Sequence, residues 1–201
     1  MLDAQLAGPG LRERKKQQTR TAIRQAALRL FLDKGYDATT TSEIARAAEV
    51  STGTLFNYFP TKEALLFADD FDPVFISHLR ARPLSEPLFT AFRRAMQAGL
   101  AQIPDSSSLS YERARLILAT PALRSAMAQQ RERDARLLTE LLAERYGRPA
   151  GDFELRVAAS VLIAATETAY AAWIEAGGVG DVKAMADRAL AVAEAGAAFR
   201  L

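Results

Sequence analysis

The segment from Thr39 to Glu63, TTTSEIARAAEVSTGTLFNYFPTKE, constrains the fold more than any other part of this chain. Its pattern predicts two short helices joined by a tight turn around Glu49. We expect Thr41 to cap the first helix and Ser51 the second, because short hydroxyl side chains accept hydrogen bonds from the free N–H groups of a first helical turn. Pro60 should then end the second helix, since proline has no N–H to donate.

Small and aliphatic residues in this segment suit a helix-turn-helix. Ala45 lets the two helices cross closely, and Ile44 and Leu55 can fix the crossing as buried anchors. The second helix then carries short hydrogen-bonding side chains at its N-terminal end, which suits entry into the major groove of DNA. An ordinary helical hairpin with solvated threonines is the alternative that this spacing leaves open.

The predicted DNA-contacting residues lie in the helix-turn-helix or in the basic segment before it. Thr52 and Thr54 are expected to read base edges, whereas Tyr58 and Lys62 are placed for phosphates. The full predicted set is Arg12, Lys15, Lys16, Arg20, Thr40, Thr41, Ser42, Ser51, Thr52, Gly53, Thr54, Phe56, Asn57, Tyr58 and Lys62.

The run from Thr21 to Leu66 resembles the DNA-binding domain of the tetracycline-repressor (TetR) family of bacterial regulators. The resemblance is carried by Ile23, Ala26, Ala27, Leu30, Phe31, Gly35-Tyr36, Thr39-Thr40-Thr41, Ile44-Ala45, Ala48, Val50-Ser51, Gly53-Thr54-Leu55, Tyr58-Phe59 and Lys62-Glu63-Ala64-Leu65. It implies a DNA-binding domain followed by a helical domain that binds a ligand and dimerises. Many members have Gly where this chain has Glu49, and Tyr where it has Phe56. At positive φ, Glu49 would be strained by roughly 1 kcal/mol.

Charge and composition restrict the class of protein. Residues 1–35 carry eight basic and three acidic side chains within a chain of net charge +2, so a basic end precedes an acidic remainder, as expected of a polyanion-binding module attached to a non-binding one. Cysteine is absent, which excludes disulfides, thiolate metal sites and a cysteine nucleophile. We find no signal peptide and no apolar run of membrane-spanning length. We therefore expect a cytoplasmic protein without membrane association, cofactor or metal.

The predicted fold is all-α, with about nine helices in two domains. Residues 1–10 should be a disordered arm, 11–62 a helix-turn-helix DNA-binding domain, and 63–201 a helical ligand-binding and dimerisation domain. The first domain begins with a basic arm over 11–18, followed by a helix that ends at Gly35. The later helices are expected over 62–80 with a kink near Asp72, and then over 88–100, 111–120, 121–146, 155–174 and 182–199.

The stretch from Leu155 to Ile174 is apolar nearly all round, so it should be buried on more than one side. Together with the last helix it predicts a homodimer interface that closes a four-helix bundle across a two-fold axis. The expected interface residues are Leu155, Ala158, Leu162, Ala165, Ala169, Met185, Ala189 and Leu190. A central core helix in a monomer is the alternative.

A largely apolar effector is expected to bind among the helices between residues 62 and 174. The predicted pocket consists of Phe71, Phe75, Phe89, Phe92, Met96, Leu116, Leu123, Met127 and Trp173, with Glu167 and Tyr170 as polar groups. Most of these residues also suit a simple core. In the polar stretch QQRERDAR, Arg131, Arg133 and Arg136 are able to hold a carboxylate or phosphate, although a solvated face is the favoured interpretation.

These patterns favour a ligand-responsive transcriptional regulator, a repressor that leaves a near-palindromic operator when an effector binds. An enzyme is a rival class, but the chain has a single histidine, His78, and we find no nucleotide-binding loop and no serine-nucleophile motif. We therefore predict no catalytic residue. A ligand-blind architectural DNA-binding protein is the second rival, and the large apolar C-terminal half argues against it.

Overall fold

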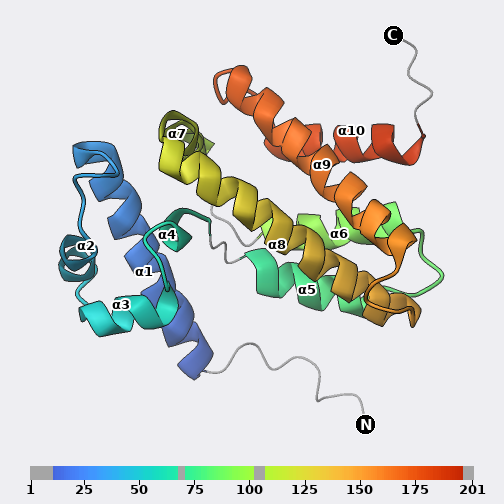
Figure 1. Cartoon of the computed structure of the whole chain (residues 1–201), viewed down its shortest axis with the longest axis horizontal. Helices are drawn as coiled ribbons and strands as arrows, with labels where there is room; N and C mark the ends of the chain where they lie inside the picture. Colours follow the sequence, from blue (N-terminus) through green and yellow to red (C-terminus); the bar gives the residue numbers. More distant parts are fainter. Residues whose placement is uncertain (1–10, 68–70, 102–106, 197–201) are drawn as a thin grey trace. The chain divides into compact units, whose positions relative to one another are not determined.

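The computed structural model describes residues 11–67, 71–101 and 107–196 of the chain. Within these ranges all regular structure is helical, in ten helices (Figure 1). They are α1 Leu11–Lys34, α2 Thr41–Ala47, α3 Thr52–Tyr58, α4 Ala64–Phe67, α5 Phe71–Ala81, α6 Leu88–Leu100, α7 Ser107–Ala119, α8 Pro121–Tyr146, α9 Phe153–Glu175 and α10 Val182–Glu194. The expected disorder of residues 1–10 concerns residues outside the described ranges.

The tenth helix arises because the stretch 62–80 forms α4 and α5 instead of one kinked helix. Pro73 lies in the first turn of α5, where the N–H that proline lacks would have no partner within the helix. Proline is therefore compatible with the start of α5 and does not kink it. Residues 68–70, which separate the two helices, lie outside the described residues.

The chain divides into two compact units, Met1–Ala68 and Asp69–Leu201. In the first unit, α1 begins at Leu11, so residues 11–18 are the first turns of a helix. The prediction of a separate basic arm before the helix is therefore wrong. Leu, Arg, Lys, Glu and Gln all have high helix propensity, which explains the extension. The helix ends as predicted at Gly35, whose φ of 88° is a left-handed value that glycine adopts without strain.

One face of α1 forms the core of the first unit. Ile23, Ala27 and Phe31 are buried there, and α1 packs against both α2 and α4. From the helix-turn-helix, Ile44 and Leu55 are fully buried, which confirms both as anchors.

The helix caps of the helix-turn-helix explain where α2 and α3 begin. Thr40, not Thr41, caps α2: its Oγ1 accepts a bond of 3.2 Å from the Glu43 N–H, and its own N–H donates to Glu43 Oε2 at 2.9 Å. This reciprocal pair is a capping box, which requires a Glu three residues after the cap. Ser51 caps α3 as predicted, with its Oγ 3.0 Å from the Thr54 nitrogen. Glu49 has a φ of 55°, so the expected strain in the turn is present.

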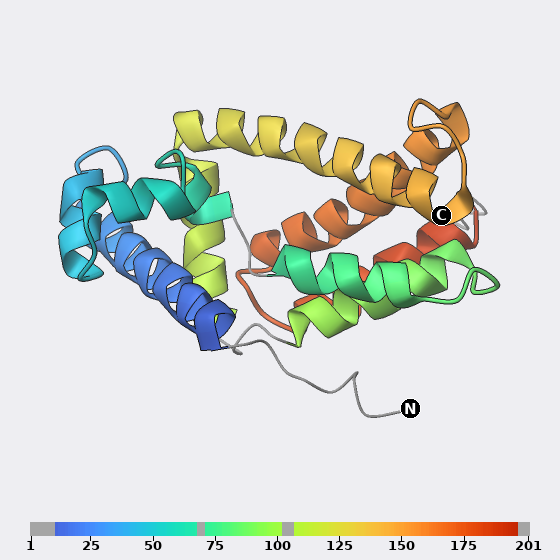
Figure 2. The same ribbon diagram turned by 90° about the horizontal axis from the view of Figure 1, so that it is seen from below.

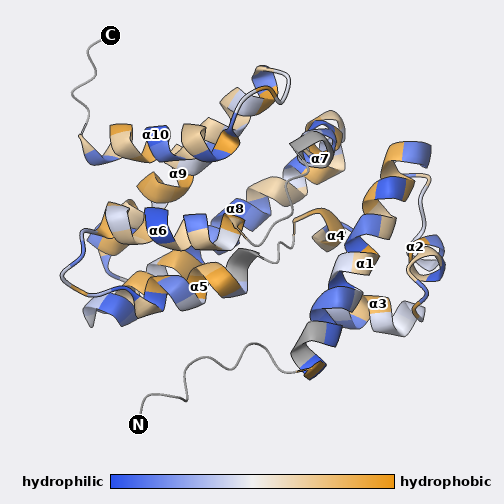
Figure 3. Ribbon diagram, turned by 180° about the vertical axis from the view of Figure 1, so that it is seen from behind, coloured by the Kyte–Doolittle hydropathy of each residue, from blue (hydrophilic) through white to orange (hydrophobic). Residues whose placement is uncertain are grey.

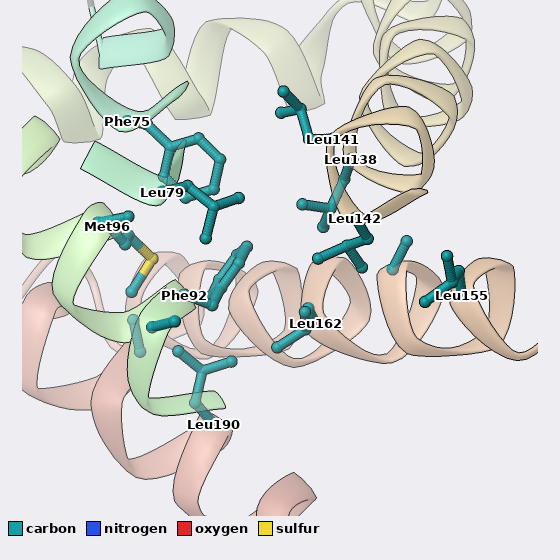
Figure 4. Close-up of a cluster of buried hydrophobic side chains, with 14 of the residues drawn as sticks. Phe75, Leu79, Phe92, Met96, Leu138, Leu141, Leu142, Leu155, Leu162 and Leu190 are labelled. Carbon is teal, nitrogen blue, oxygen red and sulfur yellow. The ribbon is translucent and has the colours of Figure 1, made fainter. Parts of the chain in front are cut away.

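The second unit contains a larger apolar core, shown in Figure 4. Its side chains come from α5, α6, α8, α9 and α10 and point toward one another. The buried members are Phe75, Leu79, Ala91, Phe92, Ala95, Met96, Leu138, Leu141, Leu142, Ala143, Leu155, Ala159, Leu162, Ala169, Ala186 and Leu190. On α8 these residues all lie in the C-terminal half, so the core is concentrated near the end of that helix.

Within this unit α6 packs on α5 and α10, and α9 packs on α8 and α10. Figure 2 shows α8 and α9 close together where α8 ends and farther apart toward α7, which contacts both of them. The bounds of α8 match the prediction, because Pro121 occupies its first turn and Gly147 ends it with a φ of 62°. By contrast, α7 begins at Ser107, four residues before the predicted start, and α10 ends at Glu194, before Gly196.

The long helix α9 is apolar over most of its length, and the turn beside its label in Figure 3 has the hydrophobic colour. By length and composition alone it could cross a membrane: an 18-residue window has a mean hydropathy of 1.4, and 22% of that window is buried. The expectation that no apolar stretch reaches this length is therefore wrong. Glu167 and two neighbouring threonines interrupt the purely apolar run but leave its mean hydropathy high.

Candidate DNA interface and effector site

The helix α3 presents one open face. Thr52, Gly53, Phe56 and Asn57 are exposed there, while Leu55 on the other side is fully buried. Phe56 is 43% exposed, which is a large apolar surface for so short a helix. Apolar side chains contact thymine methyl groups, and Asn forms paired hydrogen bonds with adenine. The exposed face of α3 therefore has the chemistry of a recognition helix.

Thr54 is less available for reading bases than the sequence suggests. Its side chain is half-buried, and its Oγ1 lies 2.8 Å from the Oγ of Ser51. The backbone N–H of Thr54 also donates to the same Ser51 oxygen. Because both hydroxyls belong to the helix cap, Thr54 is less accessible than Thr52, Phe56 and Asn57, which are exposed.

Lys62, predicted to contact phosphate, is held inside its own unit. The residue is half-buried, and its Nζ donates a hydrogen bond of 2.5 Å to the Tyr36 backbone oxygen. The same Nζ lies 4.1 Å from the centre of the Tyr36 ring and 5.7 Å from that of Phe31. These contacts join the start of α4 to the end of α1, so Lys62 has a clear structural role.

Tyr36 also bonds to Glu63, next to Lys62. The Tyr36 hydroxyl donates a hydrogen bond of 2.7 Å to Glu63 Oε1. Burial, together with this bond and the charge of Glu63, raises the pKa of Tyr36. Burial acts to raise the pKa of Glu63 as well, but the hydrogen bonds from Tyr36, from its own backbone N–H and from Thr61, together with the charge of Lys62, outweigh it and lower that pKa. Both groups therefore keep the protonation states that the bond needs at neutral pH.

The other predicted DNA contacts lie on α1 and at the start of α2. Arg12, Lys15 and Lys16 are exposed on the first turns of α1. Arg20 is half-buried, with its guanidinium 4.9 Å from the centre of the Phe59 ring. Of the three residues expected at the start of α2, Thr40 and Ser42 are exposed and Thr41 is half-buried; Tyr58 on α3 is half-buried too.

The predicted pocket residues fall into two groups. The first belongs to the core of the second unit: Phe75, Phe92 and Met96 are buried, and Phe89 packs against them. The rings of Phe75 and Phe92 meet edge to face, with centroids 5.3 Å apart. The side chain of Phe71 lies outside the described residues.

The second group surrounds Trp173. The Tyr170 ring stacks on Trp173 at 5.7 Å, and the Tyr111 ring meets Trp173 edge-on at 5.9 Å. The Trp173 indole N–H donates a bond of 3.2 Å to the Gly180 oxygen. Tyr111 was not predicted as a site residue, since a tyrosine near a helix start carries no signal of its partner. The remaining residues are on α7 and α8: Leu123 is buried, and Leu116 and Met127 are half-buried.

Glu167 is half-buried on α9 and bonded to α8: Arg131 Nε donates to Glu167 Oε1 at 2.5 Å. A separate cavity of about 250 Å³ lies near the end of α5, lined by Leu79, Arg80, Arg82, Leu84, Leu141, Glu144 and Arg145. None of the predicted pocket residues lines that cavity.

The predicted dimer residues lie mainly in the core of the second unit. Leu155, Leu162, Ala169 and Leu190 are buried there, and Ala158, Ala165, Met185 and Ala189 pack against the same cluster. The four buried side chains therefore have no surface left for a second copy. The open apolar face of α9 contains Phe153, Val157 and Val161, which are 76%, 46% and 39% exposed.

Comparison with protein families gives two matches along the chain. Residues 23–68 match the bacterial regulatory proteins of the tetR family, and residues 86–198 match the MftR C-terminal domain. The first match covers the helix-turn-helix and the second covers most of the helical unit.

Individual relatives agree with both matches. The chain is 35% identical over 148 residues to the HTH-type transcriptional regulator TcmR of Streptomyces glaucescens, spanning 70% of this chain and 66% of TcmR. It is 26% identical over 168 residues to a protein named as the mycofactocin biosynthesis transcriptional regulator MftR of Mycobacterium tuberculosis, spanning 80% of this chain and 82% of that one.

A solved structure extends the similarity to the whole fold. The TetR-family repressor FadR of Thermus thermophilus, crystallised with lauroyl-CoA, has a TM-score of 0.54 and 26% identity, over 90% of this chain and 96% of FadR. The named relatives are transcriptional regulators, and neither alternative class of function is favoured. From its helix-turn-helix to its C-terminal helical unit, this chain belongs to the TetR family of bacterial regulatory proteins.

Proposed function

We propose that this protein is a homodimeric repressor that binds operator DNA through α3 and releases it when a small, largely apolar effector binds the helical unit. One observation carries the proposal: the exposed face of α3, with Thr52, Phe56 and Asn57, stands on a buried anchor, Leu55. Such a face suits the major groove. We place its action in the cytoplasm, with no catalytic role.

The rest of the DNA interface is electrostatic. Arg12, Lys15 and Lys16 are exposed on one end of α1, and basic side chains of this kind bind the phosphate backbone or the adjacent minor groove. These contacts strengthen binding to every sequence, while α3 supplies the discrimination between sequences. Lys62 contributes by fixing α4 on α1, which differs from the direct phosphate contact expected from the sequence.

Dimerisation is proposed through the open face of α9. Phe153, Val157 and Val161 repeat every four residues, so they form one continuous apolar stripe along the helix. A second copy related by a two-fold axis would cover this stripe with its own. We prefer a second copy to a lipid bilayer because Glu167, a charged residue of the same helix α9, forms an ion pair with Arg131 of α8. Two α3 helices would then occupy successive major grooves about 34–36 Å apart.

The effector is proposed to bind next to the Trp173 group and the α8–α9 pair. The aromatic rings of Tyr111, Tyr170 and Trp173 suit an apolar molecule, and the related FadR was crystallised with lauroyl-CoA. The effector releases DNA only if it binds more tightly to a dimer whose recognition helices are wrongly spaced.

The test is a fluorescence-anisotropy titration of the full chain against the DNA that flanks its own gene, with random DNA as control, at two salt concentrations. We expect tight binding to the flank by a whole number of dimers and weak, steeply salt-dependent binding to random DNA. An Asn57→Ala variant should change which bases are tolerated, whereas Lys15→Ala should weaken binding to all sequences alike. Equal affinity for both DNAs would contradict a sequence-specific repressor.

A further inference from the structure

Phe56 is an aromatic side chain that the first unit leaves in contact with solvent. It is 43% exposed. The other aromatic residues between positions 31 and 59 are packed within the unit: Phe31, Tyr36 and Phe59 are buried, and Tyr58 is half-buried. A phenyl ring stabilises a fold through the apolar area that it removes from water, so the exposed part of Phe56 adds nothing to this core. That part of the ring is available to a partner outside the chain.

The surroundings of Phe56 on α3 are small and partly apolar. This helix packs on α2 within the first unit (Figure 1). Thr52, four residues before Phe56, is exposed on the same side of the helix and carries a methyl group beside its hydroxyl. Gly53 also lies on this side, and a Cβ added there would be 3.8 Å from the Ser51 Oγ, an ordinary contact. Packing inside the unit therefore does not require a glycine, and its open surface lets a base edge approach beside the Phe56 ring.

A phenyl ring restricts which base it can face in the major groove. The ring has no hydrogen-bonding atom, so against a guanine or cytosine edge it would displace water from polar groups without replacing their hydrogen bonds. The 5-methyl group of thymine is the apolar group that base edges present in this groove. Contact between Phe56 and such a methyl group buries one apolar surface against another.

Neighbouring residues supply the polar and charged contacts that Phe56 lacks. Asn57 is exposed beside it, and an Asn amide can both donate to and accept from an adenine edge. Arg12 and Lys15 on α1 and Arg46 on α2 are also exposed in this unit. This positive charge favours polyanionic DNA over an apolar protein surface as the partner of the α3 face.

We propose that Phe56 recognises the 5-methyl group of a pyrimidine in each operator half-site. Thymine carries this methyl group, and 5-methylcytosine carries it at the same ring position. The two bases differ at position 4, where thymine has an oxygen and cytosine an amino group, and a phenyl ring bonds to neither. Methylation of a cytosine at this position therefore strengthens binding. The inference rests on the proposed function, since it names the chemical group that α3 recognises.

The test isolates the methyl group. The full chain first selects a binding site from a random-sequence DNA library. Each symmetric pair of thymines in that site is then replaced by uracil, which lacks only the methyl group, and fluorescence anisotropy gives each Kd. Loss of one buried methyl group should weaken binding about fourfold in each half-site, or about tenfold or more for the pair. At the position that responds, 5-methylcytosine should bind more tightly than cytosine by the same factor.

Three variants assign the effect to one side chain. Phe56→Ala should remove the difference between thymine and uracil, and the difference between methylated and unmethylated cytosine. Asn57→Ala should lower affinity but keep the ratio of the thymine and uracil Kd values. Leu32→Ala removes another exposed apolar side chain of the first unit, on α1, and should change neither affinity nor ratio. Circular dichroism checks that each variant is folded.

The outcomes separate this inference from the proposed function. Equal affinity for thymine and uracil at every position, a selected site without thymine, or an unchanged ratio in Phe56→Ala would each overturn the inference. Sequence-specific binding would still stand in those cases, because the selection itself measures it. A library that yields no preferred sequence would contradict both the inference and the sequence-specific repressor.

Discussion

The two units of this protein complete their folds in different ways. The first unit has a small core, and local polar contacts hold its helices together. These contacts are the Thr40–Glu43 capping box and the hydrogen bonds that join Lys62 and Glu63 to Tyr36. The second has a larger apolar core, yet it leaves an apolar stripe uncovered on α9, at Phe153, Val157 and Val161. Surface of this kind marks an interaction site. The comparison teaches that the first unit joins its helices by contacts within one chain, whereas the second leaves an apolar stripe that we propose a second copy covers.

The largest expected effect comes from placing charged residues in the apolar stripe of α9. A Val157→Asp/Val161→Asp double variant should be monomeric, because two copies cannot bury four carboxylates against each other. Each unit should remain folded, and operator affinity should fall by about a thousandfold, or about 4 kcal/mol, since one half-site binds alone. Sedimentation velocity and anisotropy measure the two effects. Ala128→Asp, which adds the same charge to an exposed site on α8, should change neither.

Leu162, next to Val161 in sequence but fully buried, tests the other face of α9. Leu162→Ala should lower the free energy of unfolding by about 3 kcal/mol, because it opens a cavity in the core of the second unit. Urea denaturation at fixed protein concentration measures the loss. If Leu162→Ala weakened dimerisation as strongly as the double variant while leaving stability unchanged, the assignment of the two faces would be reversed.

Lys62 tests whether the first unit depends on polar contacts for its stability. Lys62→Met keeps the aliphatic stem but removes the bond to the Tyr36 oxygen and the contact with its ring. We expect the free energy of unfolding of this unit to fall by about 1–2 kcal/mol, and thermal denaturation measures this loss. Lys15→Met, on an exposed site of α1, should leave stability unchanged and lower DNA affinity. If Lys62→Met instead lowered DNA affinity and left stability unchanged, Lys62 would be a phosphate contact.

The smallest expected effect is a change in stability at low pH. Hydrogen bonds from Lys34 and Thr40 lower the pKa of Glu43 from its ordinary value of 4.5 to about 2. A depressed pKa means that the ionised group stabilises the folded state above the unfolded pKa, and that this stabilisation is lost as the pH falls toward 2. Unfolding of Glu43→Gln should therefore depend less on pH between about 4.5 and 2. An identical pH profile for the two proteins would contradict this role.

Residues with a single local role were the most predictable. Pro121 and Gly147 delimit α8 at the predicted bounds, and Ser51 caps α3 as predicted, because each acts within one turn of the chain. The cap of α2 was misplaced by one residue, although Glu43 three residues after Thr40 is a readable capping-box signal. The strain at Glu49 was expected from the resemblance, because many members of the family have Gly at this position.

Residues whose role depends on distant packing were less predictable. A helix as uniformly apolar as α9 gives no contrast between its faces, so Leu162 and Val161 cannot be assigned to core and surface from sequence. The role of Lys62 depends on Tyr36, which is far away along the chain, and the role of Arg131 depends on Glu167. The candidate pocket residues remain a prediction, with their side chains in two separate groups.

The 26-residue helix α8 is held unequally along its length, and this has a mechanical consequence. Near its end, Arg145 donates to the backbone oxygens of Arg82 and Pro83, and Leu142 is fully buried. Leu123 lies about 33 Å away along the helix at 1.5 Å per residue, so a tilt of about 5° about the Arg145 end displaces it by about 3 Å. Under the proposed function, α8 would act as a lever with its pivot at the core, and the effector would act on its long arm.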